Sequence, residues 1–207
     1  MSIFDKLFGK NKASENEDRI GDERSKFMPE EKLPLDEQFI HHFTKQGGRL
    51  LYSIDETEIQ AHFEDIMVEH DFFEQPAFCY DPQLMARFNN FNLKFSADHR
   101  EESSFFITTC EYLISDHGAI LFSSNQIKEK KPADLPETFI VIASTSQIVE
   151  TIGEGLRGIK HNSLSSIPSN ITTLKNFQER TGASQDKDLM QYGAPHKRCY
   201  LILVEDL

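Results

Sequence analysis

The feature that most constrains the fold of this chain is a set of short apolar runs without a polar face. The runs are Ala119–Phe122, Thr138–Ala143 and Tyr200–Val204, each of strand length and rich in residues that favour β-strands. A strand that is apolar on both faces has to be covered on both faces, which is typical of the central strands of a parallel sheet. The sequence therefore predicts a largely parallel sheet covered by helices.

Signals for helices and for further strands alternate around these runs. Leu35 begins a stretch that places Phe39, Ile40 and Phe43 on one helical face, and Gly47-Gly48 ends it. Weaker patterns predict strands at 50–52, 76–80 and 93–95, helices opening at Asp55 and Asp81, and helices carrying apolar residues over 148–159 and 171–177. Such alternation is typical of the α/β class. We expect a three-layer domain over residues 34–207, with a mostly parallel sheet flanked by helices.

The segment before the first apolar run carries the signals of a short helix. Thr108 and Thr109 have hydroxyls suited to an N-cap, Glu111 would lie near the positive end of the helix, and Gly118 is typical of a helix end. We therefore expect a helix over 108–118. The two threonines, together with Glu111, could instead contact a ligand.

Polar residues follow the run Ala119–Phe122 directly. Ser123, Ser124 and Gln126 begin a polar loop there, at the carboxyl edge where α/β sheets bind ligands. A second segment, Gly182 to Asp188, could begin a helix whose free amides hold an anion, with ordinary capping by Ser184 as the alternative. We expect both segments to form one cleft. The candidate ligand-binding residues are Thr108, Thr109, Ser123, Ser124, Gln126, Gly182, Ser184 and Asp188.

Other residue patterns identify no catalytic group. Asp116-His117 could form an acid/base pair or an ordinary surface pair. His41 and His42 would point about 100° apart on a helix, without a third ligand nearby, so we expect no metal there. The chain contains no nucleotide-binding glycine loop, no nucleophile elbow and no zinc-protease motif. The catalytic residues, if any, are unknown from sequence.

The composition excludes several classes of function. With 34 acidic and 22 basic residues the formal charge is −12, so the chain lacks the electrostatic attraction that drives nucleic-acid binding. Cys79, Cys110 and Cys199 are dispersed, which predicts reduced core residues rather than disulfides or cluster ligands. No run approaches the roughly 18 apolar residues of a membrane span, and the first residues lack the apolar core of a secretory signal. We expect a cytoplasmic protein without a transmembrane segment.

The first 33 residues differ in composition from the remainder. Most residues over 11–32 are charged or polar, which predicts a flexible tail that the domain does not need for folding. Ile3, Phe4, Leu7 and Phe8 share one face of a potential helix. This helix could dock on a membrane surface or a partner, or it could be a marginal terminal helix without a function.

The order of the motifs resembles that of the LUD domain family, which is named for lactate utilisation. The similar stretch is "ITT-acid-aromatic-LIS", over Ile107 to Ser115, followed by the strand and serines of 119–124, a loop ending in Leu135-Pro136, and a second apolar strand. Thr181 to Leu189 is similar to the family motif Gly-Pro-Ser-x-Thr-Ala-Asp-Ile, and Cys199 to Val204 resembles its closing strand. The resemblance extends from about Leu35 to the end of the chain.

This resemblance implies both a fold and a function. The expected fold is that of the sugar-phosphate isomerase and coenzyme A transferase-like superfamily. The expected function is that of an accessory subunit in the oxidation of lactate to pyruvate. The chain has no cysteine cluster, so iron–sulfur clusters are expected on partner subunits and no cofactor in this chain. The alternative is a stand-alone binder or enzyme for a small carboxylate or phosphorylated metabolite.

Overall fold

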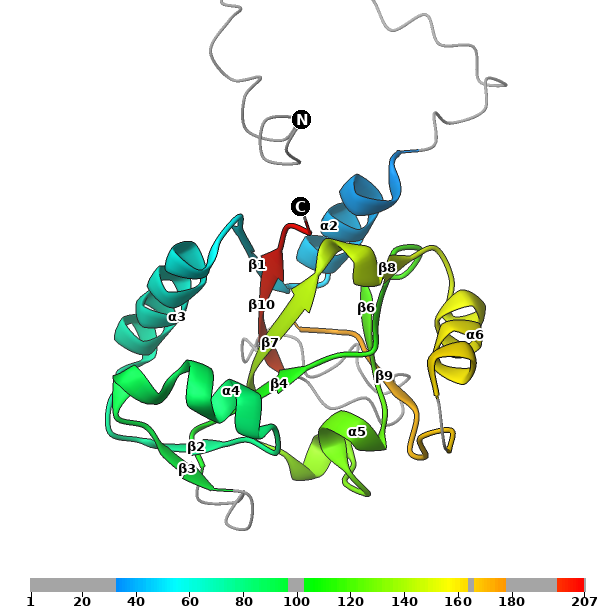
Figure 1. The fold of residues 1–207 in the computed structure, drawn as a ribbon. Coiled ribbons are helices and arrows are strands. Elements are labelled where there is room, and N and C mark those ends of the chain that lie inside the picture. Colours follow the sequence, from blue (N-terminus) through cyan, green and yellow to red (C-terminus); the bar gives the residue numbers. More distant parts are fainter. Residues whose placement is uncertain (1–32, 97–102, 164–165, 178–196, 207) are drawn as a thin grey trace, which may run out of the picture.

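The computed structural model of the chain describes residues 33–96, 103–163, 166–177 and 197–206, and its centre is a parallel sheet. Six strands pair in parallel in the order β1-β10-β7-β4-β2-β3 (Figure 1). They are β1 (Arg49–Ser53), β10 (Arg198–Val204), β7 (Thr138–Ser144), β4 (Phe105–Thr109), β2 (Pro76–Phe78) and β3 (Lys94–Ser96). Helices flank this sheet. The predicted α/β class and the mostly parallel sheet are therefore confirmed.

The central strands are apolar on both faces because their alternate residues are buried in two separate cores, one on each side of the sheet. In β10, Leu201 and Leu203 enter one core, whereas Tyr200 and Ile202 enter the other. β7 divides its side chains between the two cores in the same way. Since successive side chains of a strand point to opposite faces, both faces of this sheet are buried.

One face of the sheet is covered by α3 (Glu56–His70) and α4 (Pro82–Arg87), followed by a short 3-10 helix, η2 (Asn89–Phe91). Both α-helices begin as predicted. The Asp55 carboxylate accepts a hydrogen bond from the backbone N–H of Glu58 at 2.9 Å, and Asp81 accepts one from Gln83 at 2.8 Å. Each aspartate satisfies an amide that the first turn leaves unpaired. The buried α3 side chains are Ile59, Phe63, Ile66 and Met67.

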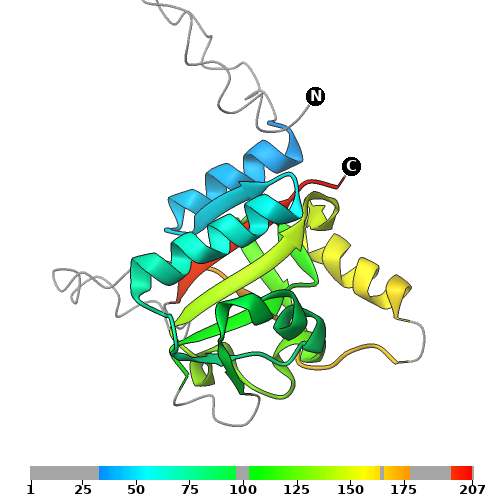
Figure 2. The same cartoon turned by 60° about the vertical axis from the view of Figure 1, so that its left-hand side comes forward.

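The other face is covered by α2 (Leu35–Lys45) and by a second sheet, which the sequence did not predict. Its strand order is β8-β5-β6-β9, with β8 (Ile148–Val149), β5 (Tyr112–Ile114), β6 (Ala119–Phe122) and β9 (Thr172–Leu174). Figure 2 shows β1 between α2 and α3. Helix α6 (Ile152–Asn162) packs on the outer face of the second sheet, where Ile114, Ala119, Leu121 and Ile159 form a third, smaller core.

The predicted helix over 108–118 is wrong. Thr108 and Thr109 end strand β4, and Leu113 and Ile114 belong to strand β5. Leu113 packs toward the main sheet and Ile114 toward α6, so these neighbours are buried on opposite faces, as only a strand permits. Gly118 does have a left-handed φ of 56°, but it lies in the turn between β5 and β6 rather than at a helix end.

Four further predictions need correction. β6 pairs antiparallel with β5 and β9, so Ala119–Phe122 is not a central strand of the parallel sheet. The helix predicted over 171–177 is wrong, because Thr172–Leu174 is strand β9. The loop predicted after Phe122 contains a short helix, α5 (Ser124–Ile127), and a 3-10 helix, η4 (Pro132–Asp134). Ile148 belongs to β8 instead of the helix that follows.

The three cysteines lie where the sequence predicts. Cys79, Cys110 and Cys199 are all buried and form no disulfide. Burial raises the pKa of each thiol, to about 11 for Cys79 and further for the other two. In the parts of the chain that the structure describes, no helix combines the length and apolarity needed to cross a membrane.

Candidate functional site

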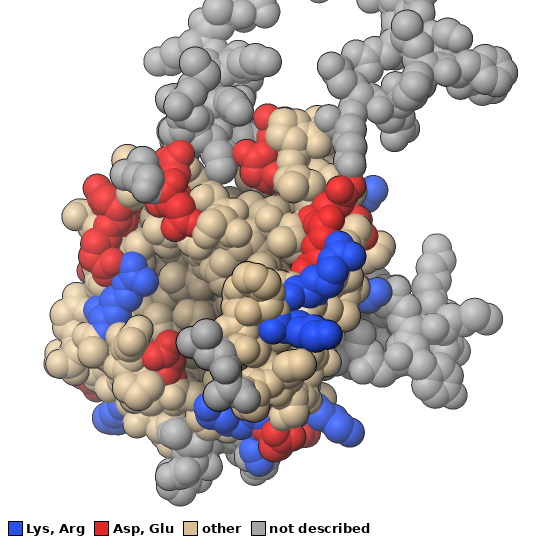
Figure 3. Space-filling model, turned by 45° about the vertical axis from the view of Figure 1, so that its right-hand side comes forward, with Lys and Arg blue, Asp and Glu red and all other residues tan. Residues whose placement is uncertain are grey.

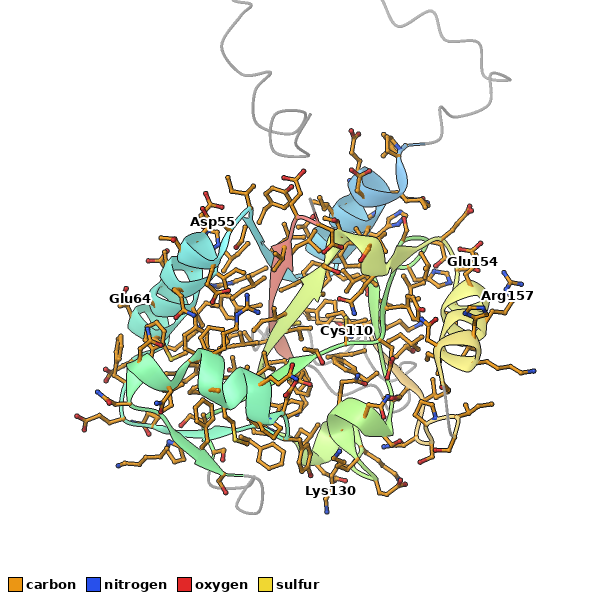
Figure 4. The ribbon with its side chains drawn as sticks, viewed as in Figure 1. Asp55, Glu64, Cys110, Lys130, Glu154 and Arg157 are labelled. Carbon is orange, nitrogen blue, oxygen red and sulfur yellow. The ribbon has the colours of Figure 1, made fainter. Side chains whose placement is uncertain are left out.

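A cleft opens where the neighbouring strands β4 and β7 end. Cys110, Glu111 and Tyr112 follow β4, while Ser146 and Gln147 lie in a 3-10 helix, η5 (Thr145–Gln147), that follows β7. The cleft has a volume of about 440 Å³, and its other walls are formed by Asn125, Ile159, Asn162, Ser163, Ser166 and Pro168. Carboxyl ends of adjacent parallel strands are where α/β sheets commonly bind ligands. Figure 4 shows Cys110 between the two sheets.

Glu111 is held by three side-chain donors. Its Oε1 accepts hydrogen bonds from Ser123 Oγ at 2.6 Å, Asn125 Nδ2 at 2.8 Å and Gln126 Nε2 at 3.1 Å. The Glu111 backbone N–H also donates to the carbonyl of Leu121 at 2.9 Å. Hydrogen bonds to an ionised acceptor are stronger than those between neutral groups, so these contacts fix the position of the carboxylate.

Helix α5 supplies these donors because its first turn is a capping box. Ser123 caps the helix, accepting from the Asn125 N–H at 3.1 Å, and the Gln126 side chain accepts from the Ser123 N–H at 2.9 Å. Reciprocal hydrogen bonds then tie α5 to a distant loop, because Ser124 N–H donates to the Ser169 carbonyl and Ser169 N–H donates to Ser124 Oγ. The helix is therefore anchored at both its cap and its side.

Gln147 fixes the opposite wall of the cleft. Its Oε1 accepts from the Ser144 N–H at 2.8 Å, and its Nε2 donates to the carbonyls of Cys110 at 2.7 Å and Glu111 at 3.2 Å. One side chain thus joins the ends of β4 and β7. The segment that carries Glu111 is held in place from both sides.

Helix α6 closes the third side, and two glycines allow it to approach closely. A Cβ at Gly158 would overlap the hydroxyl of Tyr112, and one at Gly155 would lie 2.9 Å from Leu121 Cδ2. Asn162, in the last turn, donates from Nδ2 to the Tyr112 hydroxyl at 3.1 Å. The helix therefore brings the Asn162 amide to the cleft.

The cleft is polar and its only charged lining residue among those described is Glu111. The remaining polar groups are the amides of Asn125, Gln147 and Asn162 and the hydroxyls of Tyr112 and three serines. Figure 3 shows that this side of the molecule is hollowed and that most of the surface inside the hollow is neither acidic nor basic. Such a site can bind through neutral donors and one carboxylate.

Cys110 is the other reactive side chain in the lining. It is 4 % exposed, and burial, with a smaller effect of Glu111, raises the pKa of its thiol. The thiol is therefore protonated at neutral pH and is a poor nucleophile. No group of three or more His, Cys, Asp or Glu side chains that could hold a metal occurs among the described residues.

Those predicted site residues that the structure describes lie around the cleft rather than in its lining. Thr108 and Thr109 end β4, immediately before Cys110, and Thr108 is 3 % exposed. Ser123 and Gln126 lie behind Glu111 and orient it, whereas Ser124 bonds to Ser169. Gly182, Ser184 and Asp188 lie outside the described residues, as does the tail over 1–32.

The two histidine-containing pairs lie elsewhere. His117 Nε2 is 3.5 Å from Asp116 Oδ2 in the turn after β5, where Gln46 of the segment after α2 donates to the His117 carbonyl. Neither residue lines the cleft. His42 Nδ1 is 2.7 Å from the carbonyl of Ser115, so this ring joins α2 to the second sheet.

Sequence reasoning misses most of the residues that the lining uses. The sequence allows Glu111, together with Thr108 and Thr109, either a place in the first turn of a helix or a contact to a ligand. It does not indicate Asn125, Gln147 or Asn162 as site residues. One signal could have placed α5, since Ser123 and Gln126 have the Ser-x-x-Gln spacing of a capping box. The local sequence has no comparable signal for Asn162, which reaches the cleft through the packing of α6.

Comparison with known proteins gives a family and a fold. The family model described as the LUD domain matches residues 37–204. The crystal structure of a DUF162 family protein from Deinococcus radiodurans superposes with a TM-score of 0.57 at 14 % identity, covering 83 % of this chain and 96 % of that one. At this identity the likeness shows a shared fold alone. No curated protein matches the sequence significantly.

Proposed function

Because the chain belongs to the LUD domain family, we propose that it serves in lactate utilisation, as an accessory subunit in the oxidation of lactate to pyruvate. The observation that carries this proposal is the family match over residues 37–204, which includes every strand of both sheets. The family takes its name from lactate utilisation. Membership supports a role related to this process in general, and the specific subunit role is our proposal.

We further propose that the electrons go to partner proteins. Oxidation of lactate to pyruvate releases two electrons and two protons, and oxidised iron–sulfur clusters on partner subunits would accept the electrons. The positions of the cysteines in this chain support the placement of the clusters on partner subunits. Cys79 lies in one core of the main sheet, while Cys110 and Cys199 lie in the other, and all three are buried. Thiolates that hold a cluster have to converge on it.

The cleft after β4 and β7 is the proposed ligand site. It has the position typical of ligand sites in α/β sheets, and Asn125 and Asn162 each have a second amide N–H that can donate to a carboxylate. The described lining contains no Lys or Arg, which disfavours a multiply charged phosphate. A small monocarboxylate such as lactate fits these groups better.

The second candidate function is a stand-alone binder or enzyme for a small carboxylate. The same cleft favours it, since the lining holds one oriented carboxylate that could exchange protons with a ligand. The genomic context separates the two functions. Neighbouring genes for iron–sulfur proteins favour the accessory subunit, and an isolated gene favours the stand-alone protein.

Two measurements test the proposal. The purified chain should contain no stoichiometric iron and no flavin, by metal analysis and by its absorbance spectrum. Deletion of the gene from the source organism should abolish growth on lactate but not on pyruvate, since only lactate requires the oxidation. Stoichiometric iron in the isolated chain would contradict the placement of the clusters on partners. Normal growth of the deletion strain on lactate would contradict the lactate role itself.

A further inference from the structure

The two carboxylate oxygens of Glu111 have different surroundings. All three side-chain donors, from Ser123, Asn125 and Gln126, converge on Oε1 at 2.6–3.1 Å. Three donors exceed the two lone pairs that a carboxylate oxygen offers, so Oε1 has no capacity for a ligand. Any hydrogen bond from a ligand to this side chain has to go to Oε2.

Oε2 accepts no hydrogen bond from the described residues, although Glu111 is part of the lining. The lining also contains no described Lys or Arg that could neutralise the charge. A carboxylate oxygen that is partly withdrawn from water and lacks a protein donor is stabilised by a donor from a bound molecule. The cleft therefore has an acceptor in a fixed position.

A donor for the other end of a ligand is also present. Asn162 Nδ2 has two N–H groups, and one of them donates to the Tyr112 hydroxyl at 3.1 Å. No described residue accepts from the second N–H, which can reach a ligand carboxylate because Asn162 lines the cleft. The site thus presents an acceptor at Glu111 and a neutral donor at Asn162.

We propose that Glu111 Oε2 accepts a hydrogen bond from the hydroxyl of a 2-hydroxy acid, and that this contact makes the cleft selective for 2-hydroxy over 2-keto acids. The inference rests on the proposed function, in which the ligand is a small carboxylate such as lactate. A hydroxyl donates to Oε2, whereas the keto oxygen of pyruvate is only an acceptor and is repelled by it. A hydrogen bond to a charged group corresponds to a preference of about ten- to a hundredfold.

The substitution Glu111→Gln gives a result that a purely structural role would not produce. The three donors around Oε1 will hold the amide oxygen of the new side chain, because its NH₂ group would face other donors there. The NH₂ group then takes the place of Oε2. An acceptor becomes a donor in the same position, so the preference should invert and pyruvate should bind more tightly than lactate.

The experiment is an NMR titration of the full chain with lactate, pyruvate and 2-methoxypropanoate, which has lactate's carboxylate but no hydroxyl donor. The control variant is Glu64→Gln, which makes the same chemical change on the exposed outer side of α3, far from α6 (Figure 4). The native chain and the control should bind lactate about tenfold or more tightly than either of the other ligands. Glu111→Gln should reverse the order of lactate and pyruvate.

Two results would overturn the inference, and only the second would also contradict the binding of lactate. Equal binding of all three ligands by the native chain, unchanged in Glu111→Gln, would show that Glu111 does not select the hydroxyl but would leave lactate binding intact. Binding of none of them by the native chain would remove both the inference and the proposed ligand. The comparison of native binding to lactate and 2-methoxypropanoate requires no variant, so it holds even if Glu111→Gln does not fold.

Discussion

The role of Glu111 that the sequence predicts differs from its role in the structure. After two threonines and before an aromatic residue, it has the pattern of an acid in the first turn of a helix. In the structure it lies between strands β4 and β5, in the lining of the cleft, where Ser123, Asn125 and Gln126 bind it. The donors come 12 to 15 residues later in the chain, so no local pattern could assign this role.

Tyr200 provides a residue-scale prediction at the other end of the sheet. It is 2 % exposed, and its hydroxyl lies 2.6 Å from both Arg49 Nη1 and His70 Nε2. Burial, together with Glu69, raises its pKa from 10.0 to about 12. Because the folded state holds this proton more tightly than the unfolded state, the associated stability is complete below pH 10 and is lost as the pH rises toward about 12.

Replacing Tyr200 by Phe should therefore remove part of the alkaline destabilisation. Between pH 10 and about 12, ionisation of Tyr200 should lower the free energy of unfolding of the native chain by about 2–3 kcal/mol. Two measurements check the expectation, the free energy of unfolding against pH and the ultraviolet absorbance of tyrosinate. The last of the five tyrosines to ionise should be missing from the variant. If the final ionisation step of the absorbance titration were unchanged in Tyr200→Phe, that step would belong to another tyrosine and the prediction would be wrong.

At the scale of elements, the sequence predicts those that have strong local signals. β7 and β10 are apolar on both faces, α3 and α4 have aspartate caps, and α2 ends before two glycines. The second sheet was not predictable in this way. β5 and β9 have three residues each, too short for periodicity to separate a strand from a helix. Whether such short segments form strands depends on the strands that they pair with, and β6 pairs with β9, which lies about 50 residues further along the chain.

The turn between β5 and β6 gives an element-scale prediction. Gly118 has a φ of 56°, and a Cβ at this position would overlap backbone atoms of His42 and Phe43 in α2. Gly118→Ala should lower the free energy of unfolding by about 2–4 kcal/mol, since it adds left-handed strain to a steric clash with backbone that cannot move freely. Chemical denaturation measures this change.

Gly153→Ala is the matched control for this substitution. In α6 the added Cβ would meet only Thr151 Oγ1, at 3.8 Å. The free energy of unfolding should be unchanged or raised by less than about 1 kcal/mol, because alanine is the better helix former. Equal effects of the two substitutions would contradict the close packing of the turn on α2.

At the scale of the whole molecule, the candidate site results from the stacking of two sheets. The main sheet contributes the ends of β4 and β7, the second sheet begins at Tyr112, and α6 packs on its outer face. Segments around residues 111, 125, 147 and 162 meet only because of this arrangement. The sequence predicts Ser123 and Gln126 as ligand contacts at the end of a central parallel strand, whereas in the structure they follow the antiparallel strand β6 and bind Glu111. The sequence could not indicate the lining, which depends on the unpredicted sheet.

The central claim is that the cleft after β4 and β7 binds a small carboxylate. Its most direct test is to follow the side-chain amide resonances of Asn125, Gln147 and Asn162 by NMR while lactate is added. All three residues line the cleft, so their signals should shift together, with one dissociation constant. Shifts confined to the opposite end of the sheet, around Arg49 and Tyr200, or no shift of these amides at saturating lactate, would contradict the claim.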